Sequence, residues 1–450
     1  MGRIFGIWLA VISVAWADEE MEVALSTESV LFPTYVAAIE NKDQSFSSLY
    51  VESLEKILQF DLKYAGYFFL LPKEEAKEKV LLQDKEGFRS VLWNKKLCMF
   101  VMKPAIVQKK LSLQVFLVES KGIKKFSEIS LSGVLSKDRK KIHQLTDTLI
   151  EGVLQKKGFA LAKVLYTVRT PVQGQSKKWI SELWVCDYDG ANGVALTREN
   201  SYCVHPIFFP RKNSSIHEIL YVSYKTGQPK IYLSSLEKAE ATTFVSLRGN
   251  QLIPSLSPNG NRLAFISDAA GRPDLFVQKL DSDGKCCEKP IQLFSFPRAT
   301  EASPSFSPDG EKLSFVSDKD GSPRIYIMKI PESNSFKTPY VQVVTRRNKI
   351  NVTPAWSPDG TKLAYSAKTS DIYQIWIYDF VTDEEWQLTK GPGNKENPSW
   401  APDSMHVIYN TEDAGSAELY MTNLHQMESV KIMTAGGGRK RFPCWEPARR

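Results

Sequence analysis

No apolar run in these 450 residues is long enough to cross a bilayer. The longest, residues 4–14, holds about eleven residues, whereas a transmembrane helix needs ~20. Arg3 precedes this run, and the sequence A-W-A at residues 15–17 follows it. That order is typical of a secretory signal peptide, so we expect residues 1–17 to be cleaved off, close to Ala17. The mature chain is then exported, begins near Asp18 and does not itself span a membrane.

Cysteine and histidine are also scarce, with six and five residues respectively. The cysteines are too few and too scattered for a disulfide framework, and they lack the paired C-x-x-C spacing of zinc sites. Their oxidation state stays open. The histidines occur singly, which favours structural or solvent-facing roles over metal binding. We therefore expect no metal and no cofactor.

Catalytic signatures are missing as well. The sequence has no G-x-S-x-G nucleophile elbow and no H-E-x-x-H metalloprotease motif. Two acidic stretches, D-Y-D-G at 187–190 and D-S-D-G at 281–284, lack the distal glutamate of an EF-hand, so turns explain them better. The formal net charge of +7 is mild for this length and argues for neither nucleic-acid nor membrane-surface binding. No catalytic residue is predicted.

What the sequence does contain is a repeat. Four similar segments, each with a leading proline and a tight turn of the S-P-D-G type, occur at 253–260, 303–310, 353–360 and 397–404, with weaker copies at 205–210 and 442–447. Their leading prolines lie 44 to 50 residues apart, at Pro206, Pro254, Pro304, Pro354, Pro398 and Pro443. This period is typical of one four-stranded blade per repeat. The sequence therefore predicts a six-bladed β-propeller over residues 160–450.

The two ends of the repeat predict how the ring closes. Residues 162–197 contain strands two to four of a blade without a first strand, whereas residues 442–447 form a first strand without a blade. Pairing them removes two open sheet edges. We expect the C-terminal strand to be the inner strand of the first blade, and deletion of residues 442–450 to destabilise the propeller.

Before residue 160 the pattern changes. Strand-like runs at 30–39, 67–71, 97–102, 111–119 and 126–131 alternate with helical runs at 45–62, 73–82 and 137–157. This alternation favours a small α/β domain over residues 29–159, so the fold class expected for the chain is α+β, multi-domain. Residues 18–28 form a short acidic lead-in that contains Asp18, Glu19, Glu20 and Glu22.

Basic residues gather in the loops of one propeller rim. In an antiparallel four-stranded blade, the loop between strands two and three and the loop to the next blade emerge on the same face. Every inter-blade loop contributes a basic residue, against few acids, mainly Glu199, Glu301 and Glu396. Charged loops are ordinary on surfaces, but these converge on one mouth, where their potentials add. We interpret this mouth as a partner-binding face formed by Arg198, Arg248, Arg298, Arg346, Arg347, Lys349, Lys390, Lys395, Arg439, Lys440 and Arg441.

Three features together resemble a known family. They are E-L-W-V-C-D-Y-D-G at residues 182–190, the repeated S-P-D-G turns, and F-P-C-W-E-P at 442–447. They resemble TolB, the soluble periplasmic component of the Tol-Pal envelope system, over nearly the whole mature chain. The resemblance implies a non-catalytic periplasmic scaffold that binds the lipoprotein Pal through the propeller mouth, with residues 296–298 in the Pal-facing region. It also implies binding of the inner-membrane protein TolA through residues 18–28, and a role in outer-membrane integrity and in its invagination during cell division.

Two functions of different classes stay open at this stage. The scaffold hypothesis predicts that charge reversal at Arg346 and Arg347 weakens Pal binding and leaves the fold intact. The alternative is a secreted hydrolase or carbohydrate-binding propeller that acts from the same mouth, which a substrate screen would reveal. Nucleic acid is not an expected partner, and envelope proteins beyond Pal and TolA are left open.

Overall fold

In the computed structural model, the described residues are 31–75, 77, 81, 93, 97–172, 174–210, 217–237, 240–296, 298–331, 340–426 and 428–448. The expected signal peptide (1–17) and acidic segment (18–28) lie outside these residues, as does most of the helical run expected at 73–82. None of the helices in the described ranges is both long and apolar enough to cross a membrane.

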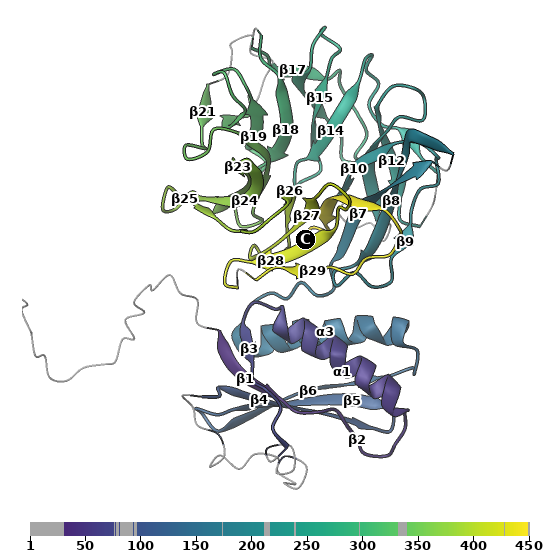
Figure 1. Cartoon of the computed structure of the whole chain (residues 1–450), viewed down its shortest axis with the longest axis vertical. Coiled ribbons are helices and arrows are strands. Elements are labelled where there is room, and N and C mark those ends of the chain that lie inside the picture. Colours follow the sequence, from purple (N-terminus) through teal and green to yellow (C-terminus); the bar gives the residue numbers. More distant parts are fainter. Residues whose placement is uncertain are drawn as a thin grey trace, which may run out of the picture.

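The N-terminal domain is a mixed sheet covered on one face by two helices. The sheet order is β3-β1-β4-β5-β6, with β2 beside β4, and the strands are β1 (Phe32–Val36), β2 (Glu40–Asn41), β3 (Phe68–Leu70), β4 (Phe100–Val107), β5 (Lys110–Leu117) and β6 (Gly122–Ser130). Helices α1 (Ser48–Lys63) and α3 (Leu135–Leu154) lie between this sheet and the propeller (Figure 1). This region is the α/β domain that the alternating pattern predicts, although β4 continues five residues past the predicted end at 102.

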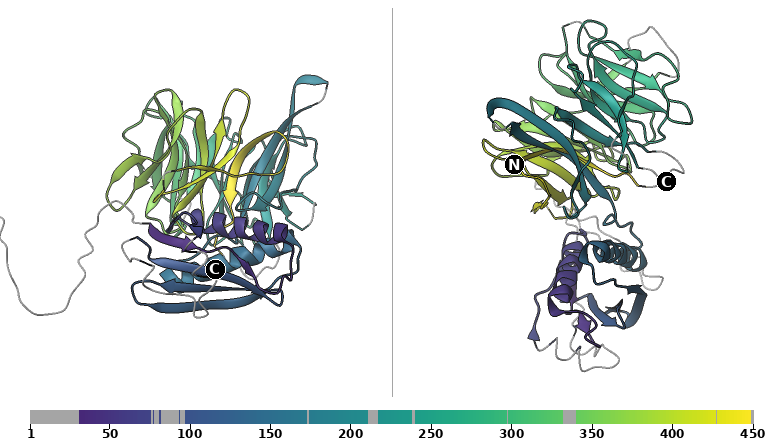
Figure 2. Two further views of the ribbon diagram at one scale, coloured as in Figure 1. Left: turned by 60° about the horizontal axis from the view of Figure 1, so that its bottom comes forward. Right: turned by 90° about the vertical axis from the view of Figure 1, so that its right-hand side faces the viewer.

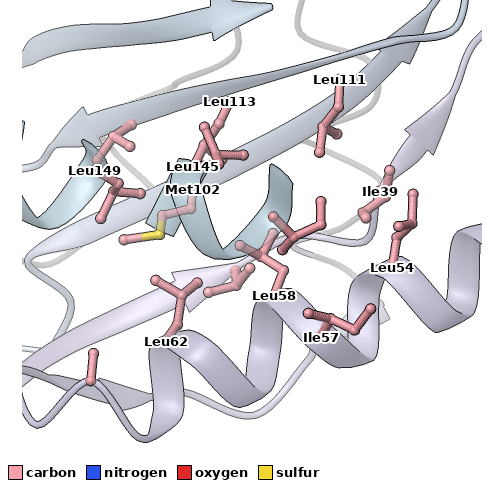
Figure 3. Close-up of a cluster of buried hydrophobic side chains, with 14 of the residues drawn as sticks. Ile39, Leu54, Ile57, Leu58, Leu62, Met102, Leu111, Leu113, Leu145 and Leu149 are labelled. Atoms are coloured by element: carbon pink, nitrogen blue, oxygen red, sulfur yellow. The ribbon is translucent and has the colours of Figure 1, made fainter. Parts of the chain in front are cut away.

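The core of this domain follows from the helical period. On α1, Leu54, Leu58 and Leu62 recur every fourth residue and are fully buried, because that spacing places them on one face of the helix. They pack with Leu145 and Leu149 of α3 against inward-facing side chains of β4 and β5 (Figure 3). Both helices are therefore held to the sheet by apolar burial, and their opposite sides remain available to the propeller.

The rest of the chain forms six four-stranded antiparallel blades, as predicted. From the inner strand outward, blade 1 consists of β30 (Arg439–Trp445), β7 (Lys163–Val172), β8 (Gln175–Asp187) and β9 (Val194–Ala195), and blade 2 of β10 (Cys203–Phe208), β11 (Glu218–Ser223), β12 (Lys230–Ser235) and β13 (Thr242–Thr243). Blade 3 consists of β14 (Gln251–Leu256), β15 (Arg262–Ser267), β16 (Asp274–Lys279) and β17 (Ile291–Phe294), and blade 4 of β18 (Glu301–Phe306), β19 (Lys312–Ser317), β20 (Arg324–Lys329) and β21 (Val341–Val343). Blade 5 consists of β22 (Asn351–Trp356), β23 (Lys362–Thr369), β24 (Ile372–Asp379) and β25 (Glu384–Gln387), and blade 6 of β26 (Asn394–Trp400), β27 (His406–Glu412), β28 (Leu419–Asn423) and β29 (Val430–Lys431).

The repeated S-P-D-G turn has a direct structural explanation. In blade 4, the Gly310 amide donates to the carbonyl oxygen of Ser307 (2.8 Å), and Gly310 has a φ of +75°, which glycine adopts without strain. The Ser307 hydroxyl accepts a hydrogen bond from the Lys312 amide (2.9 Å) across the turn. Serine and glycine thus close the link between the first and second strands.

The ring closes as the repeat predicts. β30 pairs antiparallel with β7, from Arg439 opposite Arg169 to Trp445 opposite Val164, so the last strand becomes the inner strand of blade 1. Trp445 is 3% exposed and packs against Phe159 of the segment that joins the two domains. The closing strand therefore contributes to the blade and to the domain junction together.

The N-terminal domain sits on one face of the propeller (Figure 2). His406, which follows the first turn of blade 6, donates from Nε2 to the carbonyl oxygen of Tyr64 (2.8 Å), and His425 donates from Nδ1 to the carbonyl oxygen of Gly66 (3.0 Å). In blade 1, the Tyr188 hydroxyl donates to the Asp61 carboxylate. These contacts use the turns between strands one and two and between strands three and four.

Candidate functional site

The propeller face opposite the N-terminal domain carries the loops in which the sequence concentrates basic residues. We call it the distal face; it consists of the six inter-blade loops and the six loops between strands two and three. In an antiparallel blade these loops lie at the other end from the turns that contact the end of α1, through His406 and Tyr188, and α3, through Asp189. The N-terminal domain therefore leaves the distal face uncovered.

Seven of the eleven predicted binding residues are exposed. Six of these seven form no ion pair with another described residue, and they come from five of the six inter-blade loops: Arg198, Arg248, Arg298, Arg347, Lys349 and Lys390. Arg248 also donates from Nε to the carbonyl oxygen of Ala269 (3.3 Å), which orients its side chain. Uncompensated cations on neighbouring loops produce a positive potential over this face.

The other five predicted residues have partners within the protein. Arg439 and Arg441 both pair with the carboxylate of Glu412, and Lys440 pairs with Glu418 (3.0 Å). Arg346 is exposed, but its guanidinium makes two hydrogen bonds to Asp383 (3.0 and 3.1 Å) across the boundary between blades 4 and 5. Lys395 is 5% exposed and donates to the carbonyl oxygens of Gly391, Pro392 and Gly393.

The position of Lys395 recurs around the ring. Three residues before the leading proline of each inner strand stands a buried residue, polar in five of the six blades: Cys203, Gln251, Glu301, Asn351, Lys395 and Lys440. Gln251 donates to the carbonyl oxygens of Val245 (3.1 Å) and Leu247 (3.0 Å), and Asn351 donates to that of Asn348 (2.7 Å). In these blades, as at Lys395, the side chain turns back to hold the loop that leads into its own strand.

The three acids that the sequence places among these basic residues, Glu199, Glu301 and Glu396, are partly or fully withdrawn from the surface, whereas Asp320 and Asp371, in loops between strands two and three, are exposed and pair with Lys319 and Lys368. Glu199 accepts hydrogen bonds from the Tyr221 hydroxyl (2.7 Å) and the Lys225 ammonium (2.8 Å). Burial, together with the charge of Asp274, raises the pKa of Glu301 to about 7, so a proton neutralises a large part of it at neutral pH. Burial also raises the pKa of Glu396. These carboxyl groups therefore offset the exposed cations less than the sequence indicates.

Sequence reasoning did not identify a cluster at the edge of the distal face. The loop between strands two and three of blade 1 is a long ribbon formed by β7 and β8, and Arg169 on it lies over the ring of Trp179 (4.5 Å to the centroid). The sequence does contain an indication of this ribbon, because the segment that comprises strands two and three is longer in blade 1 than in every other blade.

The domain junction is a second feature that the sequence did not indicate. His143 of α3, for which the sequence favours a structural or solvent-facing role, is buried there and hydrogen-bonds Asp61 through Nδ1 (2.8 Å). Its Nε2 lies 3.5 Å from Asp189, which also pairs with Arg139. This arrangement joins residues 128 positions apart and has no short-range sequence signature. No group of three or more His, Cys, Asp or Glu side chains that could hold a metal occurs in the described part of the chain.

Comparisons with known proteins point to one family. A family model described as "TolB beta propeller domain" matches residues 150–449. The Protein TolB homolog of Protochlamydia amoebophila is 43% identical over 386 residues, covering 84% of this chain and 82% of the relative. That of Chlamydia pneumoniae is 37% identical over 432 residues, covering 95% and 93%. The crystal structure of TolB from Acinetobacter baumannii matches with a TM-score of 0.71 at 22% identity over 94% of this chain and 98% of that one, which supports the shared fold.

Proposed function

This chain belongs to the TolB family, and from that premise we propose that it is a non-catalytic scaffold of the periplasmic Tol-Pal system. It binds the peptidoglycan-associated lipoprotein Pal through the distal face of the propeller. It binds TolA through the acidic segment at residues 18–28. By joining these partners it supports outer-membrane integrity and the invagination of the outer membrane during cell division.

One observation carries the Pal-binding part of the proposal. Five inter-blade loops bring exposed arginine and lysine side chains, which form no ion pair with any described residue, to the face that the N-terminal domain leaves uncovered. Such a surface attracts a partner with an acidic patch, accelerates its association and disfavours basic partners. Arginine is also enriched at protein interfaces, where its guanidinium pairs bidentately with carboxylates.

The proposed location follows from the N-terminal end of the sequence. An apolar run preceded by Arg3 and followed by A-W-A is the pattern of a cleaved signal peptide, so the mature protein is released into the periplasm after Ala17. In that compartment the propeller reaches lipoproteins of the outer membrane, and residues 18–28 form the new N-terminus. The acids Asp18, Glu19, Glu20 and Glu22 give this terminus a charge opposite to that of the distal face.

A charge-reversal experiment tests the binding face. Arg347→Glu combined with Lys390→Glu is expected to slow association with the lipid-free Pal domain of the same organism by about tenfold or more at low salt. The difference is expected to shrink as salt rises, because exposed charges are screened. Arg346 is left intact, since its reversal would place two carboxylates beside each other at Asp383.

The matched control makes the same charge change on the opposite face. Lys285 and Lys289 are exposed in the loop between β16 and β17, on the side of the N-terminal domain. Lys285→Glu with Lys289→Glu is expected to leave Pal binding and the melting temperature unchanged. Equal loss of binding in both double variants, or in neither, would argue against a binding role for the distal face.

A further inference from the structure

Blade 1 departs from the other five in the length of one ribbon. The segment from the start of strand two to the end of strand three spans 18 residues in blades 2 to 6, at 218–235, 262–279, 312–329, 362–379 and 406–423. In blade 1 it spans 25 residues, at 163–187. Strands advance about 3.3 Å per residue, so the seven additional residues, shared between two strands, lengthen the ribbon by roughly 10 Å.

The additional length lies on the distal face. β30 pairs with β7 only as far as Arg169, and β9 pairs with β8 only at Trp184 and Val185, so the ribbon continues past both neighbours. The ladder between β7 and β8 still reaches Pro171 opposite Trp179. In Figure 2 the ribbon rises on the side of the propeller away from the N-terminal domain.

Aromatic side chains from two blades surround one arginine at the base of this ribbon. The Arg169 guanidinium carbon lies 4.5 Å from the ring centroid of Trp179 and 5.7 Å from that of Tyr202. The ring of Tyr202 in turn meets that of Tyr224 edge to face, at 5.8 Å between centroids. Tyr202 precedes β10 and Tyr224 follows β11, so blade 2 supplies half of the cluster.

The charge of Arg169 has no counterpart within the described residues. Its guanidinium forms no hydrogen bond or ion pair with any of them, and its Nε is buried without an acceptor. The acids on adjoining segments have other partners: Glu182 accepts from the Asn200 amide (2.8 Å), and Glu199 accepts from Lys225 (2.8 Å). A guanidinium that stacks on aromatic rings and is partly shielded from water binds a carboxylate more strongly than it binds a neutral acceptor. It does so through two parallel hydrogen bonds in a fixed bidentate geometry.

We propose that Arg169, Trp179, Tyr202 and Tyr224 form a carboxylate-binding wall at the edge of the distal face, which receives an acidic segment of the protein bound there. This inference rests on the proposed function, because it assigns a second contact to the same partner. The wall adds bidentate recognition to the diffuse attraction of the exposed loop cations. Tryptophan, tyrosine and arginine are the residue types that dominate binding energy at protein interfaces.

The test compares variants of the mature protein for equilibrium binding to the lipid-free Pal domain of the same organism. Arg169→Met removes the charge and keeps much of the side-chain length, and it is expected to weaken binding about tenfold or more. Tyr224→Ala is expected to weaken binding by a smaller factor. Arg169→Lys is expected to recover binding only in part, because an ammonium lacks the planar fork.

Control variants distinguish loss of the wall contact from loss of folding and from failure of the proposed function. Tyr224 lies in a loop and is 36% exposed, so its replacement tests the wall even if Arg169→Met lowers the melting temperature. Tyr340→Ala removes a tyrosine that is 85% exposed just before β21, on the other side of the blades, and is expected to bind as the unchanged protein does. Unaltered binding by both wall variants, together with weaker binding by the Arg347 and Lys390 double variant, would overturn the wall and leave the proposed function standing. No binding of Pal by the unchanged protein would overturn both.

Discussion

Lys395 and Lys390 show that two lysines five residues apart can have different roles. The sequence assigns both to the binding face, but Lys390 lies in the loop between blades 5 and 6, whereas Lys395 is the second residue of β26, which follows that loop. Lys390 is exposed, whereas Lys395 is buried and donates to three carbonyl oxygens of that loop. Burial lowers the pKa of Lys395, yet a buried ammonium is retained because it satisfies several acceptors at once.

Replacing these two lysines is expected to have different effects. Lys395→Met keeps the side-chain length but leaves the carbonyl oxygens of Gly391, Pro392 and Gly393 without their donor, which costs about 1–3 kcal/mol in the free energy of unfolding. Lys390→Met, at an exposed position, is expected to change it by at most ~0.5 kcal/mol. Denaturant unfolding measures both. Equal, small effects would show that the ammonium of Lys395 does not hold the loop.

At the scale of single elements, the strand β30 contacts three parts of the fold. It supplies the inner strand of blade 1, and Trp445 at its end packs against Phe159 in the domain junction. Phe442 lies against His205 of blade 2, with ring centroids 4.1 Å apart. One strand thereby connects the first blade, the second blade and the N-terminal domain.

Deleting residues 442–450 is expected to lower the melting temperature strongly. Loss of the buried Trp445 side chain alone removes roughly 1.5–3 kcal/mol, and the deletion also reopens an edge of β7. A chain ending at Glu446, which keeps the whole strand, is the control and is expected to melt close to the full-length protein. Thermal unfolding followed by circular dichroism measures both, and similar losses in the two truncations would contradict the closure role of β30.

At the scale of the whole molecule, a buried polar junction joins the two domains. His143 lies between two carboxylates, Asp61 and Asp189, with the Arg139 guanidinium and the Tyr188 ring also facing it. Burial alone would lower the pKa of His143, but the hydrogen bond and charge of Asp61, with the charge of Asp189, outweigh it and raise the pKa above 6.5. The protonated imidazole therefore contributes to the stability of the junction.

Because the pKa of His143 is raised in the folded protein, raising the pH removes this stabilisation. A histidine with a raised pKa contributes its full stabilisation below its unfolded pKa of 6.5 and loses it as pH rises through the folded value. We expect the melting temperature to fall as pH rises above about 7, and to fall less in His143→Gln. Starting near pH 7 keeps Asp147 largely ionised, because burial raises its pKa to about 6.

His205→Gln is the matched control for this titration. Burial lowers the pKa of His205 to about 4, so this side chain stays neutral throughout the scan. Its replacement is expected to shift the melting temperature by a similar amount at every pH. If His143→Gln keeps the pH slope of the unchanged protein, protonation of His143 does not stabilise the junction.

The sequence is enough to predict the blades, their number, the closure of the ring and the α/β character of the N-terminal domain. The blades and the α/β character follow from short-range chemistry: the S-P-D-G turn, strand alternation and the helical spacing of apolar residues. These signals lie within one or two elements, so they can be read without the tertiary fold. The number of blades and the closure follow instead from counting strands over all six repeats, which leaves one first strand without a blade and one blade without a first strand.

Which side chains of the rim remain free is settled by tertiary contacts. The sequence shows only basic side chains at Arg346, Arg347, Lys395 and Arg439. Arg347 differs from the other three because the assembled blades provide it with no hydrogen-bonded partner among the described residues. The cluster around Arg169 and the junction at His143 likewise combine residues from distant parts of the chain. Whether a charge is exposed, paired or buried depends on distances in space, and a linear pattern of arginines and lysines does not contain those distances.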